Sequence, residues 1–557
     1  MAYSSPFSLP TVPRNVSVSQ FLVQTNPDDV PPSKVIISDF DAPRHVLTYG
    51  ELRTRSAQGA ATLRSRFGMG EGDVVCIVGH NSVNWMLLCH CVLWGGGAFC
   101  AVNPLSTPHE LVHCFGIAKP SIIAVDAALL PRVKQALADA SLPPTLVQLI
   151  IIEDGHHGNI HSAEFPKFPR NFIRFQCPSV APYSLARRDN RTVMAGMCFS
   201  SGTSGRPKGV MLSHHALIAQ LLSSRATSPF LNNAHTIEVF YPPFGHIYGL
   251  VSCVLMTAWS GHHAVAMKRF DLLPYLKRCA AIKATVLRLV PSTATRMAND
   301  PAVRQLDLAS VRYVMVAGAA LSPATVRVLR TKILHPDAAV LNGYGMTECT
   351  ISTLRETRGY SHPGSLGRVA AGMEIRIVDD EMHNVSVGED GQCLVRGPTL
   401  FMGYRDNAAE TRAAFTEDGW FLTGDIVKID DDGFLWMTGR KKELIKFRGN
   451  QVAPAELEAI LLTHPLVTDA GVCGVYSQEL DTEVPIGAVT LAPSVPRSEH
   501  TEALENVTGF LEDKVSSYKR LRGGLHHLDA IPKGTTGKLQ RRDIPAAIEA
   551  AKLKAKL

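Results

Sequence analysis

The pattern of apolar positions predicts strands and helices that alternate along the first three quarters of the chain. Continuous apolar runs at 74–78 and 311–316 have the length of buried strands, and the run at 82–94, which ends at three glycines, has the length of a buried helix. Helical spacing at 323–334 precedes another apolar run at 339–341. Because strand–helix alternation is typical of parallel sheets covered by helices, this pattern predicts an α/β fold.

The pattern changes near residue 440, where the charged run 440–443 lies between two apolar stretches. A smaller α+β segment is predicted beyond it, with helices at 454–462 and 501–514 and strands at 467–475 and 486–491. We therefore expect a large N-terminal domain over residues 1–439 and a small C-terminal domain over 440–557. The His-, Phe- and Pro-rich segment 156–169 is expected to be a surface loop.

Length and charge narrow the class of protein. The 557 residues exceed the usual size of one domain, so several core-forming units are expected. Hydrophobic residues make up 45% and charged residues 19%, a globular balance. The net charge of +6 arises from 56 Lys and Arg against 50 Asp and Glu, without a basic block outside the C-terminal tail. Nucleic acid is therefore not an expected partner.

The 12 cysteines are scattered and form no C-x-x-C pair, so neither a zinc site nor a disulfide framework is predicted. Most lie in apolar runs, as Cys76, Cys198, Cys253 and Cys473 do, and are expected to be small buried residues in a reducing compartment. No apolar stretch reaches about 18 residues, and residues 1–6 lack the features of a secretory signal, so no membrane span is expected.

The tripeptide Ala555-Lys556-Leu557 keeps the small–basic–leucine chemistry of the peroxisomal signal Ser-Lys-Leu. It predicts a peroxisomal location and the peroxisomal import receptor as a partner. The alternative is a fraying Ala/Lys helix that happens to end in leucine, in which case the expected location is cytoplasmic.

A loop rich in Gly, Ser and Thr is the most informative stretch of the chain. Residues 200–209 read Ser-Ser-Gly-Thr-Ser-Gly-Arg-Pro-Lys-Gly, between apolar runs at 193–199 and 210–213. Glycines admit a bound group close to the backbone, hydroxyls and N–H groups donate to anionic oxygens, and a lysine adds charge, so the expected ligand is a polyphosphate. The spacing is not that of a Walker loop, and a flexible surface loop is the alternative. The candidate phosphate-binding residues are Ser200, Ser201, Gly202, Thr203, Ser204, Gly205 and Lys208.

Four further motifs follow in a fixed order, at 342–348, 419–425, 439–446 running on to 451–456, and 532–538. With these motifs the chain resembles the adenylate-forming enzymes, which comprise acyl-CoA synthetases, coumarate–CoA ligases, firefly luciferase and the adenylation domains of peptide synthetases. The resemblance runs from residues 47–52 to Lys538, nearly the whole chain. It implies a large N-terminal domain, a small mobile C-terminal domain, and ATP, Mg²⁺ and CoA as cofactors.

The resemblance assigns roles in the first half-reaction, in which a carboxylate attacks the α-phosphate of ATP. Positive charge and hydrogen-bond donors are needed because two anions must meet. Glu348 matches the magnesium ligand, Thr347 a phosphate contact, and Lys538 the catalytic lysine between carboxylate and phosphate. Asp425 and Arg440 match the residues that hold the ribose. The ring of Tyr344 is implied to stack on adenine, in a slot formed with Gly318, Ala319, Asn342 and Gly343.

For the second half-reaction, attack of a thiol on the acyl-AMP, the resemblance implies that the C-terminal domain rotates about a hinge at Lys442. Lys446 and Gln451 match positions near AMP and the acyl group, and Gly449 lies where the pantetheine tunnel is expected. His246 matches a gate near the substrate carboxylate, although Gly245 before it departs from the usual Phe-His pair. A hydrogen-bonded core histidine is the alternative at that position.

The predicted function is that of an ATP-dependent carboxylic acid–CoA ligase that works through an acyl-AMP. Small side chains around Tyr248, Gly249, Gly343 and 345–350 leave room for an aryl or medium-chain acid. Three alternatives remain open: a stand-alone adenylating enzyme that loads a carrier-protein thiol, a luciferase-like oxygenase, and an inactive nucleotide-binding scaffold.

Overall fold

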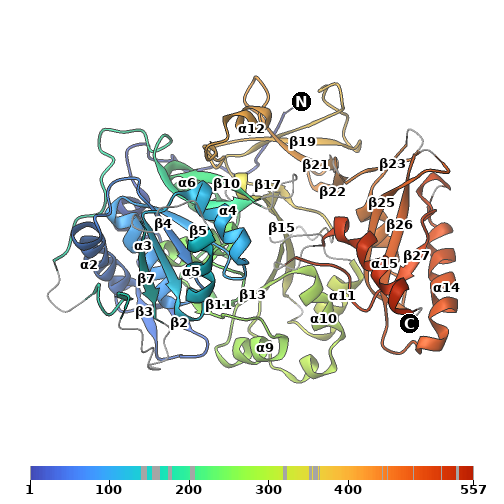
Figure 1. Cartoon of the computed structure of the whole chain (residues 1–557), viewed down its shortest axis with the longest axis horizontal. Helices are drawn as coiled ribbons and strands as arrows, with labels where there is room; N and C mark the ends of the chain where they lie inside the picture. Colours follow the sequence, from blue (N-terminus) through green and yellow to red (C-terminus); the bar gives the residue numbers. More distant parts are fainter. Residues whose placement is uncertain are drawn as a thin grey trace.

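The structure is a computed structural model, and it describes most of the chain. The described residues are 2–139, 147–153, 164–173, 178–200, 207–317, 323–335, 337–349, 354–355, 362, 364–441, 443–447, 450–480, 482–515, 517–534 and 539–555. Elements that precede Arg440 build the larger body, and those that follow build a smaller body at the right of Figure 1. The expected α/β class, with a large N-terminal and a smaller C-terminal domain, is confirmed.

A largely parallel eight-stranded sheet forms one half of the larger body, in the order β20-β10-β9-β5-β4-β6-β7-β8. Strands β9, β5, β4, β6, β7 and β8 run parallel, whereas β10 and β20 are antiparallel additions at one edge. The strands are β4 (Val74–Val78), β5 (Ala98–Val102), β6 (Ile122–Asp126), β7 (Gln148–Ile152), β8 (Lys167–Phe168), β9 (Met194–Ser200), β10 (Lys208–Ser213) and β20 (Gly403–Tyr404).

The predicted strand at 74–78 and helix at 82–94 are confirmed as β4 and α3 (Val83–Gly95). Ser82 caps the helix at its start, and Gly96 ends it in the left-handed conformation that glycine adopts without strain. The expected loop at 156–169 is wrong at its end, because Lys167 and Phe168 form the edge strand β8 against β7. Two residues are too few to show an alternating pattern, so the pairing had no signal in the sequence. Residues 154–163 of that segment lie outside the described part.

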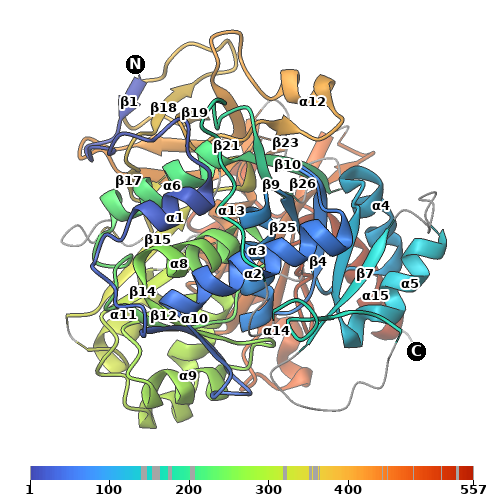
Figure 2. The same cartoon turned by 90° about the vertical axis from the view of Figure 1, so that its left-hand side faces the viewer.

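Helices cover the eight-stranded sheet, and Figure 2 shows the long α2 lying beside α3. Every residue of α3 is buried, as its uniformly apolar sequence requires. The helices of this half are α1 (Val18–Gln24), α2 (Tyr49–Phe67), α4 (Pro108–Ala118), α5 (Leu130–Asp139) and α6 (His214–Thr227).

Two further sheets complete the α/β part of the larger body. In the five-stranded sheet, the parallel strands β13, β14 and β15 confirm the predicted strands at 311–316 and 339–341, and α11 confirms the helix at 323–334. The four-stranded sheet has the order β11-β12-β2-β3. The strands are β2 (Val35–Asp39), β3 (Val46–Thr48), β11 (Ile237–Phe240), β12 (His263–Ala266), β13 (Val286–Leu289), β14 (Tyr313–Ala317), β15 (Ala339–Tyr344), β16 (Leu354–Arg355) and β17 (Arg368–Val369). The helical segments are α7 (Ile247–Gly249), the π-helical Leu250–Leu255, α8 (Met256–Ser260), α9 (Leu272–Ala281), α10 (Pro291–Asn299) and α11 (Pro323–Lys332).

An antiparallel sheet at the top of Figure 1 lies between the α/β part and the C-terminal body. The N-terminal strand β1 pairs with β18 at its edge, next to one another in Figure 2. The elements are β1 (Ala2–Ser4), β18 (Glu374–Val378), β19 (Gly391–Arg396), β21 (Phe421–Ile429), β22 (Leu435–Arg440) and the short α12 (Ala408–Ala413).

The C-terminal body has its own hydrophobic core, built around Val452, Leu457, Val472, Val489 and Val507. Its three-stranded sheet, β25-β26-β27, confirms the strands and helices predicted for this segment. The elements are β23 (Ile445–Phe447), β24 (Asn450–Val452), α13 (Pro454–Leu461), β25 (Val467–Ser477), β26 (Thr482–Leu491), α14 (His500–Glu512), β27 (Leu525–His527) and α15 (Ile544–Ala555).

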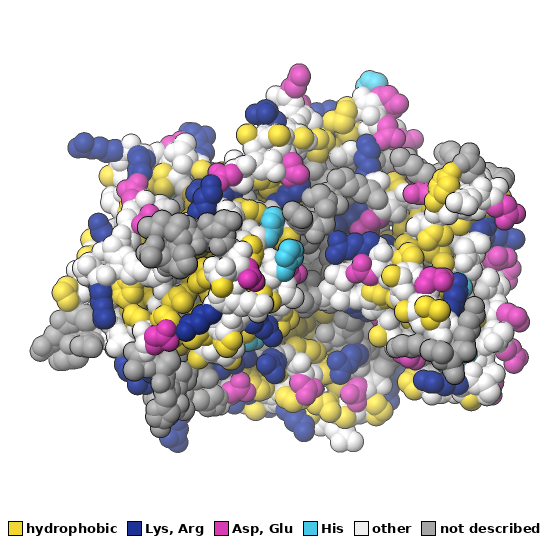
Figure 3. Space-filling view, viewed as in Figure 1, with side chains coloured by type: hydrophobic (Ala, Val, Ile, Leu, Met, Phe, Trp, Pro, Cys, Tyr) yellow, Lys and Arg dark blue, Asp and Glu magenta, His cyan; other side chains and the backbone are white. Residues whose placement is uncertain are grey.

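The mixed charge of the surface and the burial of the cysteines agree with the expectations from the sequence. On the face in Figure 3, Lys and Arg side chains are interspersed with Asp and Glu. The described cysteines are buried and none of them forms a disulfide with another described cysteine, and burial was expected for Cys76, Cys198, Cys253 and Cys473. None of the described helices combines the length and apolar character that crossing a membrane requires.

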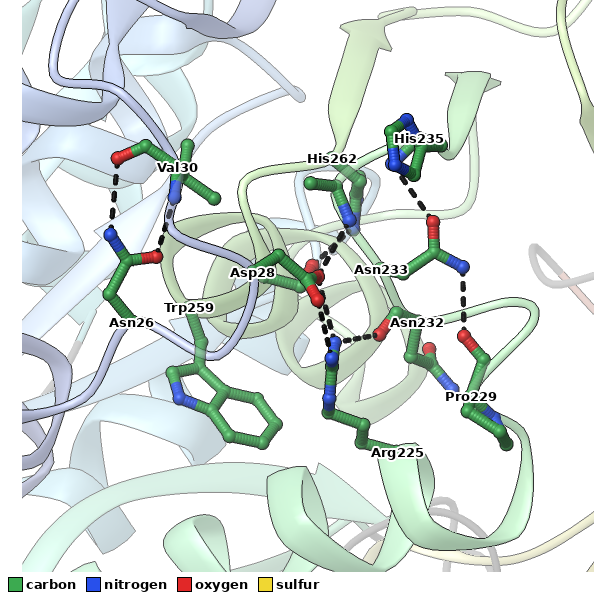
Figure 4. Close-up of polar contacts among 12 residues, drawn as sticks. Asn26, Asp28, Val30, Arg225, Pro229, Asn232, Asn233, His235, Trp259 and His262 are labelled. Atoms are coloured by element: carbon green, nitrogen blue, oxygen red, sulfur yellow. Dashed lines mark hydrogen bonds and ion pairs between the residues drawn. The ribbon is translucent and has the colours of Figure 1, made fainter.

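Ion pairs anchor segments of the larger body that are far apart in sequence. Arg225, near the end of α6, donates to Asp28 through both terminal nitrogens, at 2.9 and 2.5 Å, and to the carbonyl of Asn232 (Figure 4). The guanidinium lies 5.9 Å from the ring of Trp259. Burial alone would raise the pKa of Asp28, but the Arg225 contact and the N–H of Ala234 hold that pKa below its ordinary value.

A second ion pair is fully buried and joins strands β11 and β13. Arg288 of β13 donates from Nε to Glu238 of β11 at 2.5 Å, and His262 lies 3.3 Å from the other carboxylate oxygen. All three side chains are at most 1% exposed. Burial would raise the pKa of Glu238, yet the charge of Arg288 and the His262 contact hold it below its ordinary value. Glu238 is therefore an ionised carboxylate that depends on its partner.

We predict that Arg288→Met destabilises the protein by about 3–5 kcal/mol, because it leaves the buried carboxylate of Glu238 unpaired. The double variant Glu238→Gln/Arg288→Met removes both charges and recovers most of the loss. Thermal unfolding of the three proteins, followed by circular dichroism, measures the difference. A double variant no more stable than Arg288→Met would contradict this account.

Candidate functional site

The expected phosphate-binding loop joins two antiparallel strands. Ser200, the last residue of β9, is the register partner of Lys208, the first residue of β10. Residues 201–206, which include the predicted Ser201, Gly202, Thr203, Ser204 and Gly205, lie outside the described part. The hydroxyl of Ser200 is buried and has no hydrogen-bond partner among the described residues. The loop thus begins and ends at two predicted phosphate-binding residues that the sheet holds side by side.

Lys208 already has an anionic partner. Its ammonium lies 2.6 Å from a carboxylate oxygen of Glu410 in α12 and 4.9 Å from the ring centroid of Tyr404 in β20. The Lys208 side chain is 19% exposed and that of Glu410 39%. A cavity of about 150 Å³ adjoins this pair, between α4, the start of β10 and residues 404–410. Lys208 is therefore held at the edge of open space next to the loop.

Glu348 lies in the short 3-10 turn Thr347–Cys349 that follows β15. Its side chain is 9% exposed, so it is not the exposed acid that a Gly-rich turn alone would predict. The hydroxyl of Tyr404 donates to Oε1 at 3.1 Å, and the N–H of Phe401 donates to the Glu348 carbonyl at 2.8 Å. Burial and the charge of Glu348 raise the pKa of Tyr404 well above its ordinary value, so its hydroxyl stays protonated and donates.

The environment of Glu348 fits a magnesium ion that is shared with a nucleotide. Among the described residues there is no cluster of three or more His, Cys, Asp and Glu side chains that would form a site made of protein ligands alone. Mg²⁺ keeps several waters and is commonly held by one or two carboxylates together with substrate phosphates. A single buried carboxylate near the phosphate-binding loop meets that requirement.

Tyr344, Asp425 and Arg440 converge from two sheets. The hydroxyl of Tyr344, the last residue of β15, donates to Oδ2 of Asp425 at 2.6 Å. Arg440 of β22 is the register partner of Asp425 in β21, and its Nε lies 3.1 Å from Oδ1. Burial and the neighbouring carboxylate raise the pKa of Tyr344 well above its ordinary value. Asp425 is 2% exposed, so these two donors hold the carboxylate in one orientation.

The remaining residues of the 342–348 motif surround this cluster. Asn342 is buried and donates from its side-chain amide to the Ser365 carbonyl at 2.8 Å, while its Oδ1 has no partner among the described residues. A Cβ on Gly343 would lie 2.5 Å from the terminal methyl of Met315, so a larger residue there would require the Met315 side chain to move. Thr347 is 5% exposed. Gly318 and Ala319 lie outside the described residues.

His246 caps the short helix α7, where its Nδ1 accepts from the N–H of Tyr248 at 3.2 Å. The residue is exposed, so it is not the hydrogen-bonded core histidine considered as the alternative. Gly245, the departure from the usual motif, packs against β5, since a Cβ there would lie 2.8 Å from the Val102 carbonyl.

The predicted catalytic residues of the C-terminal body are described only in part. Lys446 in β23 and Gln451 in β24 are register partners, so the backbone places these two predicted residues opposite each other. Lys442, Gly449 and Lys538 lie outside the described residues. Lys533 and Leu539, on either side of the segment that holds Lys538, form an antiparallel bridge.

Sequence reasoning missed two residues that contact the predicted site, Tyr404 and Glu410. Both belong to the segment 403–411, where Asn407 caps α12. The only signal in that segment is the helix cap, and no spacing relates it to Glu348 or Lys208. Pairing of β20 with β10 brings them together.

Two family models match the chain. The family model for AMP-binding enzymes matches residues 24–405, and the model for the AMP-binding enzyme C-terminal domain matches residues 456–538. Among solved structures, the anthranilate CoA ligase AuaEII in complex with anthranoyl-AMP superposes with a TM-score of 0.83 at 23% identity, over 98% of this chain and 99% of that one.

Curated relatives cover similar lengths. "Probable CoA ligase CCL5" from Humulus lupulus is 32% identical over 519 residues, 92% of this chain and 90% of the relative. "Peroxisomal OPC-8:0-CoA ligase 1" from Arabidopsis thaliana is 30% identical over 508 residues, 89% of this chain and 88% of the relative. The chain therefore belongs to the family of AMP-binding enzymes, the adenylate-forming superfamily to which its motifs pointed.

Proposed function

We propose that this enzyme, an ATP-dependent and AMP-forming acid–CoA ligase, activates an aryl or medium-chain carboxylic acid as its acyl-AMP and transfers the acyl group to CoA. The observation that carries the proposal is the convergence of Tyr344, Asp425 and Arg440 beside the buried Glu348. An aromatic ring, a buried carboxylate and an arginine suit a nucleoside, and the neighbouring loop suits its phosphates.

In the first half-reaction, the acid's carboxylate attacks the α-phosphorus of ATP and pyrophosphate leaves. Lys208 and the loop at 200–206 bind the phosphates, and Asp425 and Arg440 hold the ribose. Mg²⁺, the usual metal of the family, neutralises phosphate charge when bound, and Glu348 is the residue to hold it. The proposed role of Lys538 is to offset, with its positive charge, the repulsion between the acid's carboxylate and the α-phosphate.

In the second half-reaction, the thiol of CoA attacks the acyl carbonyl and AMP leaves. The C-terminal domain presents Lys446, Gly449 and Gln451 to the site after rotating about Lys442. Two observations support the boundary at residue 440: β22, the last strand of the antiparallel sheet, ends at Arg440, and the core of the C-terminal body is built from residues 445–521. A hinge at such a point changes few packed contacts.

The acid pocket is proposed near Tyr248, Gly249 and Gly343, at the carboxyl ends of the parallel strands, where open α/β sheets bind ligands. A Cβ on Gly249 would lie 2.1 Å from the Pro243 carbonyl oxygen, so backbone packing requires glycine there. Two relatives are named 4-coumarate–CoA ligase 1 and Peroxisomal OPC-8:0-CoA ligase 1, and these names support an aryl or medium-chain acid.

A peroxisomal location is supported by the Ala555-Lys556-Leu557 tripeptide and by the peroxisomal relative. The import receptor is then a transient partner of the folded enzyme.

We predict that pyrophosphate release depends on the acid supplied and that thioester forms only when CoA is added. A panel of benzoates, cinnamates and fatty acids of six to twelve carbons, each assayed with and without CoA, identifies the class. Transfer of the acyl group to a carrier protein with none to CoA would instead support the carrier-loading alternative.

We predict that Lys538→Ala slows adenylate formation about 100- to 1,000-fold, because one charge that stabilises the transition state is lost. Thioester formation from supplied acyl-AMP stays within about three-fold. Lys446→Ala is expected to slow thioester formation, with a smaller effect on adenylate formation, because Lys446 acts in the second step. Single-turnover kinetics of each half-reaction measures both.

The matched control is Lys533→Ala, which removes a lysine of the same segment whose partner is Asp469. It should leave both half-reactions within about three-fold. If Lys538→Ala slowed both half-reactions equally, the division of roles would be wrong.

We predict that a fluorescent reporter fused before residues 548–557 enters peroxisomes and that a reporter ending in Ala-Lys-Ser stays in the cytosol. Confocal co-localisation with a peroxisomal marker reads the outcome. A diffuse signal from the first fusion would reject the location.

A further inference from the structure

Strand β20 and the residues just before it contact two charged segments of the site. One is the end of the phosphate-binding loop, which carries Lys208, and the other is the turn that carries Glu348. Tyr404 is the register partner of Val210 in β10, and the N–H of Arg405 donates to the Gly209 carbonyl at 2.8 Å. Just before β20, the N–H of Phe401 donates to the carbonyl of Glu348 itself. Residues 401–405 are therefore fixed by their backbone to the end of the phosphate-binding loop and to the turn that carries Glu348.

The side chain of Tyr404 also contacts both segments, through Glu348 and Lys208. Its hydroxyl donates to Oε1 of Glu348 at 3.1 Å, and its ring lies under the ammonium of Lys208. The residue is 9% exposed, and its ring packs edge-on against Phe401 with centroids 5.0 Å apart. A ring packed in this way has little rotational freedom, so the position of its hydroxyl is fixed.

An ionised carboxylate can only accept hydrogen bonds, and a glutamate has three rotatable bonds to restrain. Glu348 is nearly buried, so water does little to hold it. A fixed donor on one oxygen selects one rotamer and leaves the other oxygen for a further ligand. Partners of this kind behind a metal-binding side chain typically contribute 10- to 100-fold in metal affinity or activity.

We propose that Tyr404 is a positioning residue that holds the Glu348 carboxylate toward the phosphate-binding loop, so that the magnesium–nucleotide complex meets a preorganised ligand. The inference rests on the proposed role of Glu348. The Tyr404 hydroxyl donates to Glu348, so the loss of that hydroxyl is expected to change the metal requirement of adenylate formation.

The test is Tyr404→Phe in the full-length enzyme, which keeps the ring and its packing and removes only the hydroxyl. We expect the Mg²⁺ concentration for half-maximal pyrophosphate release to rise about ten-fold. Binding of Mn²⁺ to the enzyme–ATP complex, measured by water proton relaxation, weakens by a similar factor. ATP binding in excess EDTA, measured by calorimetry, stays within about two-fold, and the melting temperature stays within about 2 °C.

Glu348→Gln, assayed in parallel, separates this proposal from the one on which it rests. If Glu348→Gln raises the Mg²⁺ requirement and Tyr404→Phe does not, the positioning role is overturned and the role of Glu348 stands. If neither variant changes the Mg²⁺ requirement, the assignment of Glu348 fails and that of Tyr404 fails with it. A Tyr404→Phe enzyme that loses metal-free ATP binding and thermal stability, at an unchanged Mg²⁺ requirement, would show a merely structural residue.

Discussion

The buried carboxylate of Asp425 is the constraint that brings the two halves of the site together. A charge that is 2% exposed must be paired, and its partners come from different sheets: Tyr344 ends a parallel strand and Arg440 ends an antiparallel one. The edge of one sheet is thereby fixed against the other, next to Glu348. Two carboxylate oxygens have room for about four hydrogen bonds. The two donors therefore orient Asp425 and leave acceptor capacity, which is what a ribose diol requires.

Two cations of the site, Lys208 and Arg440, form ion pairs with carboxylates of the described residues. Lys208 contacts Glu410 and Arg440 contacts Asp425. The Lys208–Glu410 pair is partly exposed, and such pairs contribute about 1 kcal/mol or less to stability. A polyphosphate offers several anionic oxygens to the same ammonium, so an exchange of partner from Glu410 to phosphate costs little. The neighbouring cavity gives the lysine space for that movement.

The sequence predicted those parts of the fold in which one segment carries its own signal. Three such signals were sufficient to predict their elements. They are the apolar length of β4, the Ser82 start and Gly96 end of α3, and the strand–helix alternation around β14 and β15. Strands of two or three residues, such as β8, β20 and β1, were not predicted, since they are too short to show a period of two. Their partners are 15 or more residues away, so only the assembled sheet defines them.

The same distinction explains which site residues were found. Asn342, Tyr344, Glu348 and Asp425 belong to the motifs by which the chain resembles the adenylate-forming enzymes, so that resemblance singled them out. Tyr404 is a common residue next to a glycine in an ordinary segment, and its importance arises from contact with a residue 56 positions away. A nearly buried glutamate needs a hydrogen-bond donor, but the burial of Glu348 is known only from the structure. Which side chain supplies the donor depends on the register of β20 against β10, which no motif encodes.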